Sequence, residues 1–170
     1  SDYICPFCLK LEQAQGYNLG VAMREGRIQL IVHPLGYLDS YSTTNYSSRA
    51  ANAAATVAAL APEYFWDFNQ TLWRHQPAEG GPGLSDEDLV ALALEAGVPA
   101  AVADQFGDGL YAAWVAESTA GIAASEQFQG TPWVLMKVPG EDQYYQWYWP
   151  NDDLDQAVAN VAAGQAPAGS

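Results

Sequence analysis

Basic residues are scarce in this chain. It has 6 Lys and Arg residues against 20 Asp and Glu residues, which gives a formal net charge of −14. A surface this acidic repels phosphate backbones and anionic lipid headgroups, so nucleic acid and anionic membranes are excluded as direct partners. The acidic residues are scattered along the chain, and we interpret them as a solvated surface.

Long apolar runs are also absent. No stretch approaches the roughly 18 apolar residues that a membrane-spanning helix needs. The start of the chain shows no signal-peptide pattern, but only four residues precede Cys5, so this absence carries little weight. The length of 170 residues suits one domain, or one domain that carries an insertion.

Cysteine occurs only twice, as Cys5 and Cys8. A bridge between them closes too small a loop to stabilise the fold much, so the pair needs a chemical explanation. Cys-x-x-Cys is the spacing of a redox dithiol, and it is also half of a zinc site. Zinc needs two more ligands, and His33 and His75 lie about forty residues apart rather than in a His-x3–5-His pattern. We therefore favour the redox dithiol over a zinc site or an inert buried pair.

The position of Cys5 predicts its chemistry. Pro6 fits the first turn of a helix, which we expect from about Pro6 to Met23. Cys5 then lies among the unpaired N–H groups at the positive end of the helix dipole, where its thiolate is favoured. Because the thiolate attacks disulfides, we predict Cys5 to be the nucleophile. Cys8 lies one turn later on the same face, and we predict it to resolve the mixed disulfide.

The remaining sequence predicts a strand, a block of helices, a hairpin and a last helix. Ile28–Val32 is a β-branched run that predicts a buried strand, and Pro34 ends it. The helices are expected at 49–60 with Ser47 or Ser48 as its cap, at 63–75, at 89–96 after a capping-type start at Ser85, at 100–105, and at 108–125. Residues 133–138 and 143–149 predict the hairpin, and Asn151 or Asp152 is expected to cap a helix that ends near 163. This order predicts an α/β fold with a helical insertion.

The chain resembles the DsbA-like thiol–disulfide oxidoreductases of the thioredoxin superfamily, especially the secreted or membrane-anchored forms of actinobacteria. The resemblance covers nearly the whole chain. Its functional signature is the stretch Asp2-Tyr3-Ile4-Cys5-Pro6-Phe7-Cys8 together with Gly130-Thr131-Pro132, and the segments 33–39, 46–53 and 69–84 indicate the subgroup.

The resemblance implies a thioredoxin-like fold with an inserted helical domain. The thioredoxin-like domain would consist of residues 1–45 and 126–165, the inserted α-helical domain of residues 46–125, and a flexible tail of residues 166–170. The strand that the family has before the motif is missing from this chain. In the family that strand usually carries a buried acid that helps proton transfer to the second cysteine, so no such residue can be named from the sequence.

The resemblance also implies a second half of the site. Thr131-Pro132 would be a cis peptide packed against the cysteines, with the Thr131 backbone free to pair with an extended substrate. Pro132 would exclude a backbone donor and keep metals from the thiols. Trp133 is a candidate for lining the substrate groove. The aromatic run 144–149 is a second candidate binding surface, although hairpin packing explains it better.

Two further residues are relevant to how strongly oxidising the protein is. Phe7 stands where the most oxidising members have a thiolate-stabilising histidine, so we expect a milder oxidant. His33 ends the predicted strand and is a candidate for tuning Cys5, although a structural hydrogen-bonded role explains it better.

These observations predict an extracytoplasmic dithiol–disulfide oxidoreductase, an oxidase that introduces disulfides into secreted proteins through Cys5-Pro6-Phe7-Cys8. The alternatives are a disulfide reductase or isomerase on the same site, or a redox-inert peptide-binding or chaperone-like module. The expected partners are reduced or misoxidised unfolded secreted proteins and, from the resemblance, a membrane quinone-linked reoxidising partner. We expect a monomer without cofactor or metal, secreted or anchored at the cell envelope.

Overall fold

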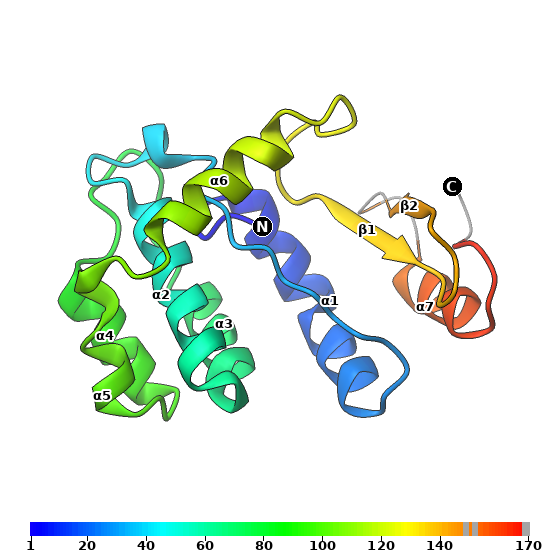
Figure 1. Ribbon diagram of the computed structural model, residues 1–170, viewed down its shortest axis with the longest axis horizontal. Helices are drawn as coiled ribbons and strands as arrows, with labels where there is room; N and C mark the ends of the chain where they lie inside the picture. Colours follow the sequence, from blue (N-terminus) through cyan, green and yellow to red (C-terminus); the bar gives the residue numbers. More distant parts are fainter. Residues whose placement is uncertain (148–149, 151–152, 168–170) are drawn as a thin grey trace. The chain divides into compact units, whose positions relative to one another are not determined.

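The computed structural model describes residues 1–147, 150 and 153–167, and the chain divides into two compact units. The first unit is Ser1–Leu9 with His33–Thr131, and the second is Lys10–Val32 with Pro132–Ser170. Helix α1, Pro6–Arg24, begins in the first unit and continues into the second (Figure 1). The division into a domain of residues 1–45 and 126–165 and a domain of residues 46–125 stays a prediction.

Helix α2, Tyr46–Leu60, is the centre of the first unit. Its buried face is rich in alanine, with Ala50, Ala53 and Ala54 fully enclosed, and such short side chains let neighbouring helices approach closely. It contacts α3, α5 and α6, and α4 packs on α3 and α5 (Figure 1). The bounds are Phe65–Arg74 for α3, Asp86–Glu95 for α4, Ala100–Ala103 for α5 and Ala112–Ala123 for α6, with short 3-10 turns at Asp39–Tyr41, Pro62–Tyr64 and Phe106–Asp108.

The predicted cap of this helix at Ser47 or Ser48 is wrong. The helix already begins at Tyr46, whose backbone N–H donates to Ser42 Oγ at 2.8 Å. The N–H of Ser48 donates to Asp39 Oδ1 at 2.9 Å. The first turn is therefore satisfied by side chains from the preceding 3-10 turn and the residue that follows it, which a pattern read within the helix does not reveal.

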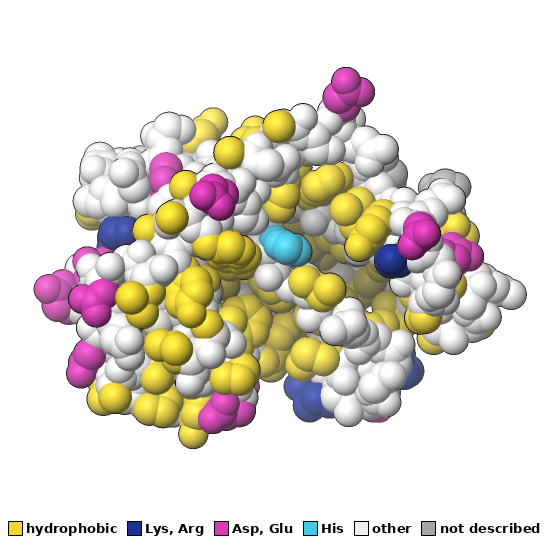
Figure 2. Space-filling view, in the orientation of Figure 1, with side chains coloured by type: hydrophobic (Ala, Val, Ile, Leu, Met, Phe, Trp, Pro, Cys, Tyr) yellow, Lys and Arg dark blue, Asp and Glu magenta, His cyan; other side chains and the backbone are white. Residues whose placement is uncertain are grey.

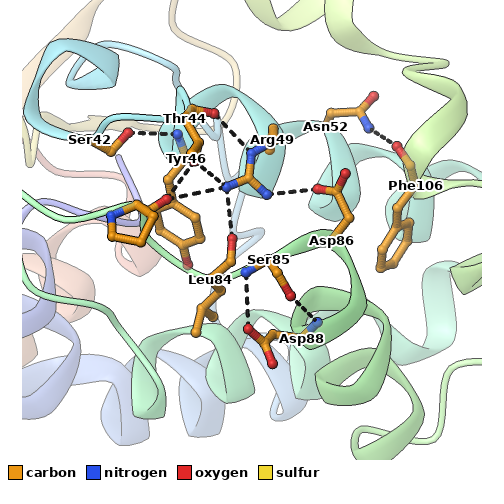
Figure 3. A network of polar contacts seen from close by, with 11 residues as sticks. Ser42, Thr44, Tyr46, Arg49, Asn52, Leu84, Ser85, Asp86, Asp88 and Phe106 are labelled. Carbon is orange, nitrogen blue, oxygen red and sulfur yellow. Dashed lines mark hydrogen bonds and ion pairs between the residues drawn. The ribbon is translucent and has the colours of Figure 1, made fainter.

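The start of α4 was predicted correctly and is part of a larger polar network (Figure 3). Ser85 Oγ accepts from the Asp88 N–H at 3.1 Å, and Asp88 Oδ2 accepts from the Ser85 N–H at 3.0 Å, which is a capping box. Arg49 of α2 reaches the same place, where it donates to Asp86 Oδ1 and to the Leu84 carbonyl oxygen, each at 2.7 Å. These contacts fix the end of the loop that joins α3 to α4.

The second unit contains the predicted hairpin. Strands β1, Val134–Lys137, and β2, Tyr144–Trp147, pair antiparallel with Val134 opposite Trp147. Helix α7, Leu154–Ala162, is capped by Asp153, whose Oδ1 accepts from the Gln156 N–H at 3.1 Å. A small core of this unit joins α1, the hairpin and α7 through Leu11, Ala22, Trp147, Leu154, Ala157 and Val158. The expected caps Asn151 and Asp152, the expected strand end at 148–149 and positions 168–170 of the expected tail lie outside the described residues.

The predicted strand at Ile28–Val32 is wrong for the described chain, in which the only sheet is the two-stranded hairpin. A strand needs a partner that bonds along its length, and no described segment bonds to residues 28–32 in this way. Bonds of the parallel type occur at the residues that follow. The Ser1 amino group donates to the His33 carbonyl oxygen at 3.0 Å, and the Leu35 N–H donates to the Ser1 carbonyl oxygen at 2.9 Å.

Acidic side chains are scattered over the face seen in Figure 2, with few basic side chains among them. This distribution agrees with a solvated acidic surface. Among the described residues, no helix is both long enough and apolar enough to cross a bilayer.

Gly83 gives a test of the loop that joins α3 to α4. Its φ is +73°, and an added Cβ would lie 2.5 Å from Tyr46 Cβ. We expect Gly83→Ala to lower the free energy of unfolding by about 2–4 kcal/mol, because left-handed strain and overpacking add. Gly80 is the control, since its φ is +86° but nothing lies within 4 Å of an added Cβ. Gly80→Ala should cost only about 1 kcal/mol. Equal losses for the two variants in urea unfolding would contradict this packing.

Candidate active site

Cys5 lies at the start of α1, as the sequence predicts. The helix begins at Pro6, and the Leu9 N–H donates to the Cys5 carbonyl oxygen at 3.2 Å. The Cys5 N–H donates back to the Asp2 carbonyl oxygen at 3.0 Å, so a tight turn leads into the helix. Cys5 is therefore the N-cap residue, beside the backbone N–H groups of the first helical turn.

The two sulfurs are buried, although the residues between them are not. Cys5 is 2% exposed and Cys8 is 1% exposed, and both are free thiols. Pro6 is exposed, and Phe7 is 59% exposed. The motif thus has two exposed apolar side chains, Pro6 and Phe7, next to two buried sulfurs.

The environment separates the acidities of the two thiols. A hydrogen bond from the Cys8 thiol is the largest cause that lowers the pKa of Cys5 from 9.0 to about 6, and burial opposes it. The Thr131 side chain and the N–H groups of Cys8 and Phe7 lower it further. Burial is the largest cause that raises the pKa of Cys8 far above its ordinary value, and the neighbouring Cys5 raises it again. One thiol is therefore readily ionised at neutral pH and the other is held protonated.

Thr131 contacts Cys5, although the two residues are far apart in the sequence. The Cys5 Sγ lies 3.3 Å from the Thr131 carbonyl oxygen, to which a protonated thiol donates. The Thr131 Oγ1 is buried and has no hydrogen-bond partner among the described residues. Once Cys5 ionises, this hydroxyl is a donor available to the sulfur. Pro132 and Trp133 belong to the second unit, so their roles and the cis peptide stay predictions.

Asp2 is a site residue that the sequence did not identify. Its side chain is fully buried, and its carboxylate accepts from the Ile4 N–H at 3.1 Å, the Leu38 N–H at 2.8 Å and the Ser47 hydroxyl at 2.7 Å. Burial is the main cause that raises the pKa of Asp2, and these three donors oppose it. A buried acid can thus be named beside the motif, although it comes from the turn and not from a preceding strand. An Asp just before an apolar pair and a helix start was the available signal.

Helix α3 also contacts the turn that leads into Cys5, and the sequence did not predict this contact. Asn69 Oδ1 accepts from the Tyr3 hydroxyl at 2.8 Å, and the Trp73 and Tyr3 ring centroids are 4.7 Å apart. Beyond the end of the helix, Gln76 Nε2 donates to the Cys5 carbonyl oxygen at 3.0 Å. The spacing of positions 69, 73 and 76 is that of one helix face, but nothing in the sequence says what that face contacts.

The remaining candidates do not join this cluster in the described residues. The His33 side chain is exposed, loss of water around the ring lowers the pKa of His33, and no described hydrogen bond involves the ring. Its tuning role stays a prediction. The described residues include no group of three or more His, Cys, Asp or Glu side chains that could hold a metal ion.

Comparison with known proteins agrees with this geometry. The family model described as Thioredoxin matches residues 1–157. Among solved structures, the chain is similar to the reduced form of the disulfide bond oxidoreductase DsbG from Mycobacterium tuberculosis, with 33% identity and a TM-score of 0.69. That match covers 78% of this chain and 63% of DsbG, so the chain spans less than two thirds of that protein.

Two further structures are of DsbA from the same organism. The reduced form has 30% identity and a TM-score of 0.73, and the match covers 88% of this chain and 72% of that one. The oxidised form has 33% identity and a TM-score of 0.70, with 78% and 67% covered. Curated protein sequences give no match. With a family model over nearly its whole length and these structural relatives, the chain belongs to the DsbA-like proteins of the thioredoxin superfamily.

Proposed function

We propose that this protein is an extracytoplasmic dithiol–disulfide oxidoreductase that donates its Cys5–Cys8 disulfide to folding proteins. The observation that carries the proposal is the difference between the two thiols. The pKa of Cys5 is lowered to about 6, whereas burial keeps Cys8 protonated. A stabilised Cys5 thiolate favours the reduced protein, and a protein whose reduced form is favoured is an oxidant toward its clients.

The proposed reaction begins with the oxidised protein. A client thiolate attacks Cys5 Sγ, the Cys5–Cys8 bond breaks, and Cys8 leaves as a thiolate that takes up a proton. A second client thiolate then attacks the client sulfur of the mixed disulfide, and Cys5 leaves. The client gains one disulfide and loses two electrons, and the protein is left with two thiols. The low pKa of Cys5 makes it a good leaving group in this last step.

The expected surroundings follow from this chemistry. Disulfides persist outside the cytoplasm, which is why the proposed location is extracytoplasmic, secreted or anchored at the cell envelope. Each turnover leaves the protein reduced, so it needs an oxidant, and a membrane quinone-linked partner is the one that the family resemblance implies. The clients would be reduced, unfolded secreted proteins. Thr131 would pair with their extended backbone, next to Pro132.

One prediction concerns the separate roles of the two cysteines. Cys5→Ala should reduce the oxidation of a reduced, unfolded client to the uncatalysed rate, because without Cys5 the protein has no disulfide for the client thiolate to attack. Cys8→Ala cannot form the Cys5–Cys8 disulfide, but its Cys5 thiolate should attack the disulfide of an oxidised client, release one client thiolate and be captured as a mixed disulfide. Recovery of client activity measures the first effect, and mass spectrometry measures the second. A Cys5→Ala protein that kept its activity would show that the nucleophile is misassigned.

The reduction potential decides between donation and reduction of disulfides. Equilibration with glutathione should give a value well above about −270 mV, the potential typical of a reductase such as thioredoxin. A value near that of thioredoxin would contradict the oxidase and favour the reductase.

Another prediction concerns the Cys5 thiolate. Ultraviolet absorbance of the reduced protein should show one thiolate that titrates at about pH 6. Cys8→Ala should raise this midpoint by about one unit, because the thiol that donates to Cys5 is removed. Cys5→Ala should abolish the transition. A wild-type protein without any thiolate below pH 7.5 would contradict the proposed asymmetry.

A last prediction links the charge on Cys5 to the stability of the reduced protein. The pKa of Cys5 is lower when folded than its unfolded value of about 8.5, so ionisation stabilises the reduced fold above that value. This stabilisation is lost as the pH falls through about 6. Between pH 8.5 and 5, the advantage of the reduced wild type over reduced Cys5→Ser should shrink by about 2–4 kcal/mol. Urea unfolding under reducing conditions measures it, and a constant difference would contradict the lowered pKa.

A further inference from the structure

The carbonyl oxygen of Cys5 accepts from two donors. One is the Leu9 N–H at 3.2 Å, which is the first hydrogen bond of α1, and the other is Gln76 Nε2 at 3.0 Å. A carbonyl oxygen has two lone pairs, so both are used. The peptide between Cys5 and Pro6 is therefore held by the helix and, independently, by a side chain from the segment that follows α3.

The groups that lower the pKa of Cys5 are all neutral. They are the Cys8 thiol, the Thr131 side chain and two backbone N–H groups of α1. A cation stabilises a thiolate over several ångströms, whereas a neutral donor must be close and well aligned, because a hydrogen bond weakens steeply below about 120°. The charge on Cys5 thus depends on where its sulfur points, and that direction depends on the backbone at Cys5.

Gln76 itself is held in place. Its own N–H continues the last turn of α3 by donating to the Trp73 carbonyl oxygen at 3.4 Å, and Trp73 is buried against Tyr3. Farther along the loop, the Gly80 N–H donates to the Tyr41 carbonyl oxygen at 2.7 Å. Arg49 binds the far end of the loop (Figure 3). With both ends of the loop fixed, little extra ordering is needed to hold the Gln76 amide against Cys5.

We propose that Gln76 is a positioning residue for Cys5, whose amide holds the Cys5–Pro6 peptide so that the sulfur stays aligned with its neutral donors. The inference rests on the proposed function, in which Cys5 is the reacting sulfur. It gives the helical region around α3 a part in the chemistry that is separate from binding a client. Gln76, just beyond the end of α3, acts on the backbone of Cys5 through the carbonyl oxygen.

The test uses two variants of the full chain. Gln76→Met keeps the length of the side chain and removes the donor, and Gln76→Glu also places a negative charge against the carbonyl oxygen. We expect the thiolate midpoint of reduced Gln76→Met to rise by about half a unit and that of Gln76→Glu by about one unit. At pH 8 the equilibrium constant for oxidising glutathione should fall about tenfold in Gln76→Glu, which corresponds to about 30 mV.

Gln105 supplies the matched control. Its Nε2 also donates to a backbone carbonyl oxygen, that of Ala101 in α5, at 2.6 Å and at an exposed position. Gln105→Met and Gln105→Glu make the same chemical changes there, and both should leave the midpoint and the potential unchanged.

The outcomes distinguish the positioning role of Gln76 from the proposed function of the protein. An unchanged midpoint in both Gln76 variants, or an equal shift in the Gln105 variants, would overturn the positioning role while Cys5 kept its own. A wild-type protein that forms no Cys5–Cys8 disulfide would overturn the proposed function instead. If Gln76→Glu fails to fold, Gln76→Met alone decides, because it is uncharged and of similar length.

Discussion

A negative charge on a buried sulfur needs hydrogen-bond donors at fixed positions, and the first unit is arranged around meeting that need for Cys5. Burial alone would raise the pKa of the thiol, as it does for Cys8. Around Cys5, the Cys8 thiol, the start of α1 and Thr131 more than offset it. Because these groups are dipoles and not ions, their effect depends on alignment. The fold must therefore be stiff where the sequence is least regular, at the turn from Asp2 to Cys5.

The turn is kept rigid by buried polar side chains that form hydrogen bonds with one another and with the backbone. Asp2 joins the turn to Leu38 and to Ser47 of α2, and α3 joins it through Tyr3. Breaking the contacts of this buried carboxylate is costly, since each of the three donors would lose its bond to Asp2. The turn is in this way fixed from two helices before any client arrives, which is the preorganisation that a reacting group requires.

Local signals in the sequence were sufficient for α1, for the hairpin and for the capping box at Ser85, because each depends on residues that are neighbours in the chain. The errors and omissions have another origin. The strand at 28–32 failed because a strand is defined by its partner, and the first turn of α2 is satisfied by Ser42 and Asp39 rather than by its own serines. Asp2 and Gln76 were overlooked because their partners lie far away in sequence.

The face of α3 that carries Asn69 and Trp73, and that Gln76 continues just beyond the end of the helix, limits how this region can vary. One residue inserted or deleted between positions 69 and 76 turns the rest of the helix by about 100°, so contacts to Tyr3 and Cys5 could no longer form together. The exposed loop after Gln76 is not helical, so a change in its length does not rotate these side chains away from their partners. Insertions and deletions among related proteins should therefore occur mainly in the loop after position 76 and rarely inside α3. The length of α3 then indicates whether a related chain has these contacts to Tyr3 and Cys5.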